Sequence, residues 1–96
     1  MAAYLIFAID ITDPEGFKKE YAERVGATHE KYGGKLLVPG EPCDTLEGDW
    51  RPNRVAMLEF ESAEWAKRWY TSEEYAPLKD ARFKSATTRL FLVEGH

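Results

Sequence analysis

Two charged residues lie within one otherwise apolar segment, and they are the first candidates for chemistry. Arg54 opens the segment 54–60, and Glu59 stands near its end. The β-branched, aliphatic and aromatic residues of this segment favour a strand, in which side chains alternate between two faces. Arg54 and Glu59 therefore point to opposite faces, and whichever of them faces a dry cavity needs a partner or an anionic ligand. The alternative is structural: Arg54 pairs with a loop carboxylate such as Asp49, and Glu59 pairs with Arg82 or Lys84.

Imidazole and thiol groups are few in this chain. His29 lies one helical turn after Val25 and three residues before Tyr32, at the edge of an apolar stripe. A histidine there can act as a general base near neutral pH, although a lone histidine on a helix edge more often makes one structural hydrogen bond. Cys43 has no neighbouring histidine that would activate it. The spacing of these residues suits no standard metal site and no nucleotide-binding motif is present, so we expect neither a metal nor a cofactor.

Two large aromatic residues, Trp50 and Tyr75, fall outside the regular elements that the sequence predicts. A large ring in such a segment either fills a partner's pocket or lines a ligand site. Trp69 and Tyr70, by contrast, fit the packed side of a helix. Because Arg54 directly follows the loop that carries Trp50, we expect this ring and this cation to flank one opening.

The positioning elements follow from periodicity and from turn signals. Apolar and β-branched runs predict strands at 4–9, 35–38, 54–60 and 88–94, with a small additional strand at 43–46. Helical spacing and capping residues predict a helix from Pro14, capped by Asp13, to Gly33-Gly34, a second helix after Ser62 that breaks at Thr71-Ser72, and a short helix at 77–83 after a tight turn at 73–75.

The order strand, helix, strand, strand, helix, strand predicts an α+β fold of the ferredoxin-like type over one domain, residues 1–96. Such a fold has a four-stranded antiparallel sheet with both helices on one face. The first strand carries apolar residues on both of its sides, namely Leu5, Phe7 and Ile9 against Tyr4, Ile6 and Ala8. Helices can cover only one face, so we expect the other face to pack against a second copy of the chain in a homodimer.

Composition excludes several classes of function. The 96 residues include 13 basic and 17 acidic side chains, a net charge of −4, which argues against a nucleic-acid binder held by phosphate contacts. The longest apolar stretch, 1–9, stops at Asp10 and has no basic flank, so neither a membrane span nor a secretory signal is expected. We therefore expect a cytoplasmic protein.

The chain resembles the bacterial domain-of-unknown-function family 1330 along nearly its whole length. The resemblance rests on the order and spacing of short motifs: Asp13-Pro14, Tyr32-Gly33-Gly34, Glu47-Gly48-Asp49-Trp50-Arg51-Pro52, Ser72-Glu73-Glu74-Tyr75, Arg82 and Val93-Glu94-Gly95. It implies membership of the dimeric α+β-barrel superfamily, whose paired sheets close into a barrel around a small cavity. Related branches include cofactor-independent monooxygenases, lactone isomerases and haem-handling enzymes, so the resemblance leaves the chemistry open.

These observations favour a small-molecule-binding domain, with a cofactor-independent enzyme of the monooxygenase or isomerase kind as its specific form. The ligand would be a small apolar or aromatic acid in the barrel cavity. The alternative is a non-enzymatic dimeric ligand sensor or partner subunit. His29 is the candidate catalytic residue, and the candidate ligand-binding residues are Arg54, Trp50, Tyr75, Glu59, His29 and Arg82.

Overall fold

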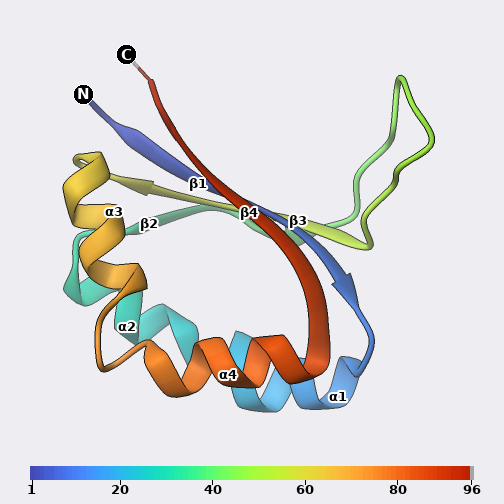
Figure 1. Ribbon diagram of the computed structural model, residues 1–96, viewed down its shortest axis with the longest axis horizontal. Coiled ribbons are helices and arrows are strands. Elements are labelled where there is room, and N and C mark those ends of the chain that lie inside the picture. The colour runs from blue at the N-terminus through green and yellow to red at the C-terminus, as the bar shows by residue number, and fades with distance from the viewer. Residues whose placement is uncertain (96) are drawn as a thin grey trace.

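Four strands form one antiparallel sheet in the order β2-β3-β1-β4, in a computed structural model that describes residues 1–95 (Figure 1). The strands are β1 (Ala3–Ile11), β2 (Lys35–Glu41), β3 (Arg54–Phe60) and β4 (Ala86–Glu94). Every neighbouring pair is antiparallel. This order, with helices between β1 and β2 and between β3 and β4, confirms the ferredoxin-like α+β fold.

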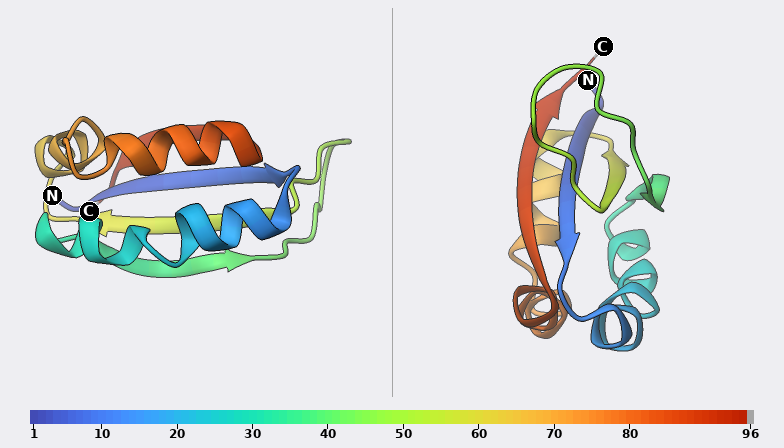
Figure 2. Two further views of the ribbon diagram at one scale, coloured as in Figure 1. Left: turned by 90° about the horizontal axis from the view of Figure 1, so that it is seen from below. Right: turned by 90° about the vertical axis from the view of Figure 1, so that its right-hand side faces the viewer.

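The helical elements lie against one face of this sheet, below it in Figure 1 and in front of it in the left view of Figure 2, which is seen from below. They are α1 (Pro14–Phe17), the π-helical turn η1 (Lys18–Ala22), α2 (Val25–Lys31), α3 (Ala63–Tyr70) and α4 (Ala76–Ser85). The two helix N-caps that the sequence predicts are present. The Asp13 side chain accepts a hydrogen bond from the Gly16 amide, and the Ser62 side chain accepts one from the Trp65 amide. None of the described helices has the length and apolar character needed to cross a membrane.

The first helical segment differs from the single helix that we expected. It is interrupted at η1, where the Glu23 amide donates to the Lys18 carbonyl across one residue more than an α-helix allows. The extra residue rotates the side chains of the following helical residues about the helix axis by part of a turn. As a result His29, which the regular spacing puts at the edge of the apolar stripe, points inward and is only 3% exposed.

Strand β2 and the segment after it also differ from expectation. The Pro39-Gly40 pair does not end the strand but forms an irregularity inside it, since β2 continues to Glu41 with register shifts on both sides of Val38. The small strand expected at 43–46 is absent, and residues 42–53 form a loop. Figure 1 shows this loop rising from the sheet on the side opposite to the helices.

The core fills the space between the helices and the sheet. Leu5, Phe7 and Ile9 of β1 face the helices. Trp69 of α3 lies at the centre, fully buried, with its ring centroid 5.8 Å from that of Phe60 and 4.0 Å from that of Tyr75. Aromatic rings of this size supply much of the apolar area that a domain of this length can bury.

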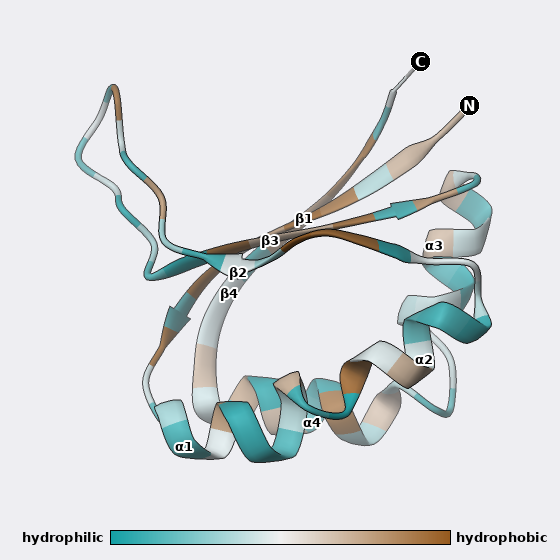
Figure 3. Ribbon diagram, turned by 180° about the vertical axis from the view of Figure 1, so that it is seen from behind, coloured by the Kyte–Doolittle hydropathy of each residue, from teal (hydrophilic) through white to brown (hydrophobic). Residues whose placement is uncertain are grey.

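The other face of the sheet is also apolar, and no helix of the described chain covers it. Its residues include Tyr4, Ile6 and Met57, which share one face by register, and Phe91 and Val93, which are 52% and 46% exposed. Figure 3 shows apolar colouring along the central strands. Contiguous apolar surface of this kind is typical of an interface. The homodimer in which two sheets pack together stays a prediction, and this face of the sheet is its expected interface.

We predict that Ile6→Glu converts a dimer into a folded monomer. The substitution places an unpaired charge in the middle of the expected interface, which should bury at least about 1,000 Å². Light scattering at micromolar concentration measures the mass, and circular dichroism checks the fold. Phe83→Glu, on an exposed position of α4 away from the sheet, is the matched control and should stay dimeric. A monomeric unmodified protein would contradict the prediction.

Candidate functional site

A cavity of about 240 Å³ lies between the helices and the sheet. Its walls are mostly aliphatic and aromatic side chains from β1, the first helical segment, β2 and β3. Three residues with polar groups line it as well: Tyr21, His29 and Arg54. The cavity lies within a single chain, so it does not depend on the barrel that two paired sheets would enclose. Enclosed apolar pockets with few polar groups are the usual sites of small-molecule binding.

His29 is the buried titratable group of this cavity. Its Nδ1 lies 3.3 Å from the Gly34 carbonyl oxygen, which can only accept, so Nδ1 carries the proton and donates. Its Nε2 then holds a free lone pair, and no described residue supplies a hydrogen bond to it. Burial lowers the pKa of His29 below its ordinary value, which keeps the ring neutral at physiological pH. A neutral imidazole with a fixed tautomer and a free Nε2 is the form that a general base requires.

Gly34 holds this imidazole through the local backbone. Its amide donates to the His29 carbonyl at 2.8 Å, so the two residues are joined in both directions. A side chain at this position is excluded, because a Cβ atom would lie 2.9 Å from the Phe60 ring and 3.0 Å from the His29 carbonyl. The preceding Gly33 has φ of +79°, which ends α2 and turns the chain back. The Gly33-Gly34 pair therefore ends the helix and also positions His29.

Arg54 lies on the helix-facing side of the sheet, and Glu59 lies on the other side, as alternation predicted. Arg54 is exposed, and its Nη1 donates to the Asn53 carbonyl at 2.8 Å. Among the described residues it forms no ion pair, so the expected pairing with Asp49 is wrong. A cation without a carboxylate partner at the edge of an apolar cavity is suited to bind an anionic group.

Arg82 and Tyr75 lie behind the cavity wall and not in the cavity. Tyr75 is fully buried and its hydroxyl lies 2.7 Å from that of Tyr21, while Arg82 Nε donates to the Tyr75 hydroxyl at 3.3 Å. Arg82 is 2% exposed, and its guanidinium stacks near the rings of Phe7 and Tyr21. The expected pairing of Arg82 with Glu59 is wrong, because the two residues lie on opposite sides of the sheet.

Trp50 and Glu59 lie on the face of the sheet away from the cavity. The Trp50 ring stacks on Arg89, with 4.5 Å between its centroid and Cζ, and Arg89 shares that face with Ala8. The expectation that Trp50 and Arg54 flank one opening is therefore wrong. Sequence reasoning missed Tyr21, a cavity residue that looked like one more member of the apolar stripe.

Cys43 is half-buried in the loop, with its sulfur 3.7 Å from the Pro52 carbonyl oxygen. Within residues 1–95, no three side chains of the metal-binding kinds gather into a cluster. Asp10 lies in β1, and its carboxylate accepts from the Asn53 amide at 3.1 Å and so ties the end of the loop to this strand. The Asn53 side chain in turn accepts from the Ile11 amide.

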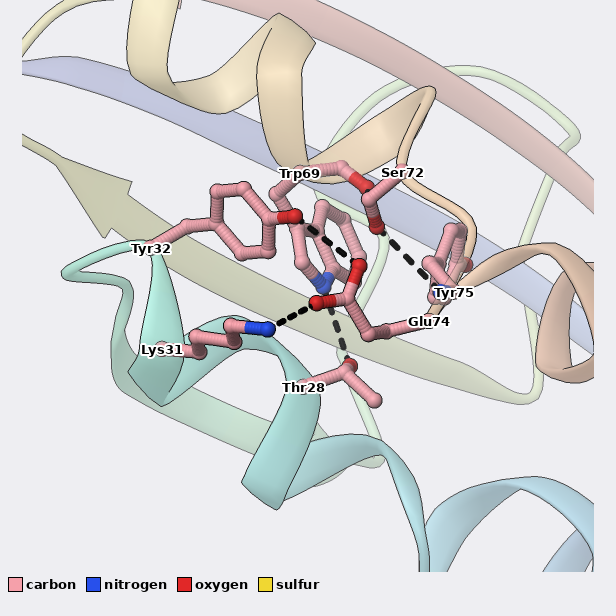
Figure 4. Close-up of polar contacts among 7 residues, drawn as sticks. All are labelled: Thr28, Lys31, Tyr32, Trp69, Ser72, Glu74 and Tyr75. Carbon is pink, nitrogen blue, oxygen red and sulfur yellow. Dashed lines mark hydrogen bonds and ion pairs between the residues drawn. The ribbon is translucent and has the colours of Figure 1, made fainter.

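A polar clamp beside His29 joins the end of α2 to α3 and to the turn that follows α3 (Figure 4). Trp69 Nε1 donates to Thr28 Oγ1 at 3.0 Å, and the Glu74 carboxylate accepts from the Tyr32 hydroxyl at 2.9 Å and from Lys31. The hydrogen bond from Lys31 is the main reason why the pKa of Glu74 falls to about 2. The clamp ties α2, which carries His29, to the turn that carries Tyr75.

We predict that the buried His29 makes the protein less stable in acid. The unfolded chain binds a proton at His29 near its ordinary pKa of about 6.5, whereas the folded chain binds it only at lower pH. The free energy of unfolding therefore falls as the pH drops below about 6.5 and continues to fall until the folded pKa is passed. Urea unfolding between about pH 7.5 and about pH 5 measures this, with His29→Gln as the control that lacks the titration. Parallel pH profiles for the two proteins would contradict it.

Comparisons with solved structures agree with this fold. RPA0582, a protein of unknown function from Rhodopseudomonas palustris, is 16% identical with a TM-score of 0.80, over 99% of this chain and 82% of that chain. SnoaB, a cofactor-independent oxygenase from Streptomyces nogalater, is 14% identical with a TM-score of 0.69, over 99% and 93%. An ethyl tert-butyl ether d (ethd) family protein from Bacillus halodurans is 18% identical with a TM-score of 0.60, over all of both chains.

These identities are low, so the likeness establishes the fold and leaves the chemistry open. No curated protein sequence matches the chain. The model of one family, described as domain of unknown function DUF1330, matches residues 2–96. The match spans nearly the whole chain and agrees with the order of motifs in its sequence. The chain therefore belongs to the DUF1330 family.

Proposed function

We propose that the cavity binds a small apolar or aromatic molecule with an acidic group, and that His29 removes a proton from it. The observation that carries this proposal is the unpartnered Nε2 of a buried, neutral imidazole in an apolar cavity. A buried polar atom without a partner costs stability, and such atoms concentrate at functional sites. Arg54, at the same cavity, would hold a carboxylate or enolate oxygen of the ligand.

Proton removal is a complete first step for two kinds of reaction without a cofactor. In an isomerisation, the proton passes from one carbon to His29 Nε2 and returns at another carbon, so atoms and electrons balance. In an oxygenation with dioxygen as co-substrate, an activated methylene loses two hydrogens and becomes a carbonyl, and the second oxygen atom leaves as water. The fold shared with SnoaB, a cofactor-independent oxygenase, supports the second reaction at the level of architecture only.

The alternative function is a non-enzymatic dimeric sensor or partner subunit that uses the same cavity. A sensor needs apolar walls and Arg54 but has no need of a free basic nitrogen. The free Nε2 of His29 therefore favours the enzyme.

We predict that Arg54→Met weakens the binding of benzoate by about tenfold to a hundredfold, since a charge-assisted hydrogen bond contributes roughly 1.5–3 kcal/mol. Isothermal titration calorimetry measures the affinity, and the neutral analogue benzamide should bind both proteins alike. Arg51→Met is the matched control, because Arg51 lies in the loop and does not line the cavity. Equal affinities of Arg54→Met and the unmodified protein for benzoate would assign Arg54 to another role.

We predict that the protein accelerates hydrogen exchange at the acidic methylene of phenylacetone, and that His29→Gln removes most of this acceleration. A positioned general base contributes typically about 10² to 10⁴ in rate. Proton NMR in deuterium oxide follows the loss of the methylene signal. Binding of phenylacetone without any acceleration would favour the sensor, and neither binding nor acceleration would contradict the proposed function.

A further inference from the structure

Three polar side chains lie in series from the core to the cavity wall. Arg82 Nε donates to the Tyr75 hydroxyl at 3.3 Å, and the Tyr75 hydroxyl lies 2.7 Å from the Tyr21 hydroxyl. Tyr21 is the member that lines the cavity, whereas Tyr75 is fully buried behind it. We call these residues the phenol relay. The proposed function does not use them so far.

The direction of the hydrogen bonds in the phenol relay follows from the groups available. A guanidinium can only donate, so the Tyr75 oxygen accepts from Arg82. The Tyr75 proton then needs an acceptor of its own, and among the described residues its hydroxyl contacts only the Tyr21 hydroxyl besides Arg82. If Tyr21 donated instead, the Tyr75 proton would be left without a partner inside the core, which is costly. Tyr75 therefore donates to Tyr21, and the Tyr21 proton is left free at the cavity wall.

Arg82 gives the phenol relay its charge. Its guanidinium is 2% exposed and forms none of the ion pairs found among the described residues. Instead it lies 5.1 Å from the ring centroid of Phe83, which does not line the cavity, and 5.8 Å and 5.9 Å from those of Phe7 and Tyr21, which do. A buried cation without a counter-ion is unfavourable, and an anion on the far side of these two rings would reduce that cost.

We propose that the phenol relay makes Tyr21 a hydrogen-bond donor to an oxyanion of the bound ligand, and that the ligand is a phenol or an enolisable ketone. This inference rests on the proposed function and names its substrate class. His29 Nε2 takes the proton as the O–H or C–H bond of the ligand breaks, and the electron pair stays on the ligand as a delocalised oxyanion. Tyr21 donates to that oxygen. Tyr21 remains protonated throughout, because burial raises its pKa well above the ordinary value.

The cavity has separate side chains for accepting a proton and for donating a hydrogen bond. A proton acceptor, His29, and a proton donor, Tyr21, line the same cavity from one helical segment. Hydrogen bonds in series polarise one another, so the charge of Arg82 strengthens the donor at the end of the relay. A donor that is positioned before the reaction and aimed at the developing charge is the usual means of stabilising an oxyanion.

The test uses para-nitrophenol, whose anion is yellow and whose neutral form is not. The unmodified protein should bind the anion at least about tenfold more tightly than the neutral phenol, which lowers the apparent pKa of the bound ligand by about one unit. Absorbance titration from acid to neutral pH measures this. In Tyr21→Phe the ligand should still bind within the apolar walls, but the part of the shift that Tyr21 contributes should be lost, and the part due to Arg54 should remain. Tyr75→Phe should lose a smaller part of the shift, because the Tyr21 hydroxyl remains and Arg82 still lies near it, but the hydrogen bond from Tyr75 that polarises it is gone.

Tyr32→Phe is the matched control, because it loses a hydroxyl that bonds Glu74 and does not line the cavity. Arg54 is present in every variant, so its contribution to the apparent pKa of the bound ligand is the same in each and does not affect the comparison. A full shift in Tyr21→Phe would overturn the phenol relay while the proposed function stands. No binding of para-nitrophenol or of its neutral analogue nitrobenzene by the unmodified protein would overturn both.

Discussion

The extra residue in the π-helical turn η1 decides which side chains of the first helical segment face the sheet. Without it, the helix would continue in phase from Phe17, and His29 would lie at the boundary with solvent. With it, Tyr21 is buried within the turn and His29 is buried after it. Both residues then reach one cavity. Wide turns of this kind are rare and are found frequently at functional sites, which agrees with the role given to these two residues.

The cavity is mostly apolar, and the polar atoms of its buried residues have hydrogen-bond partners, with one exception. His29 Nδ1 is held by Gly34, Tyr21 is held by Tyr75, and His29 Nε2 has no partner among the described residues. An unsatisfied buried acceptor costs about 1–3 kcal/mol, a large part of the net stability of a domain of this size. The clamp helps to offset this cost by tying α2 to α3 and to the turn before α4.

Features set by local pattern could be predicted from the sequence, and features set by long-range contact could not. The order of the elements, the caps at Asp13 and Ser62 and the opposite faces of Arg54 and Glu59 depend on neighbours in the chain, and the structure confirms them. The position of Trp50 depends on Arg89, which lies in the last strand. The loop could therefore not be placed from its own residues.

Burial of Tyr75 and Arg82 illustrates the same limit. Tyr75 follows a break in the helix, where a large ring usually serves a surface, yet the chain folds it under Trp69. Arg82 lies in a helix whose charged residues look solvated, yet it is buried against the rings of Phe7, Tyr21 and Phe83 and donates to the Tyr75 hydroxyl. Nothing in the local sequence marks either residue as buried behind the cavity wall.

The irregular edge strand β2 has a consequence for how copies of this chain can meet. An unpaired strand edge offers amides and carbonyls to other chains and is a common starting point for fibrous aggregation. Pro39 has no amide hydrogen to offer, and Gly40, with φ of +86°, turns the strand out of line. Growth of the sheet beyond β2 into a continuous stack is therefore blocked at this edge, which leaves β4 as the other edge of the sheet.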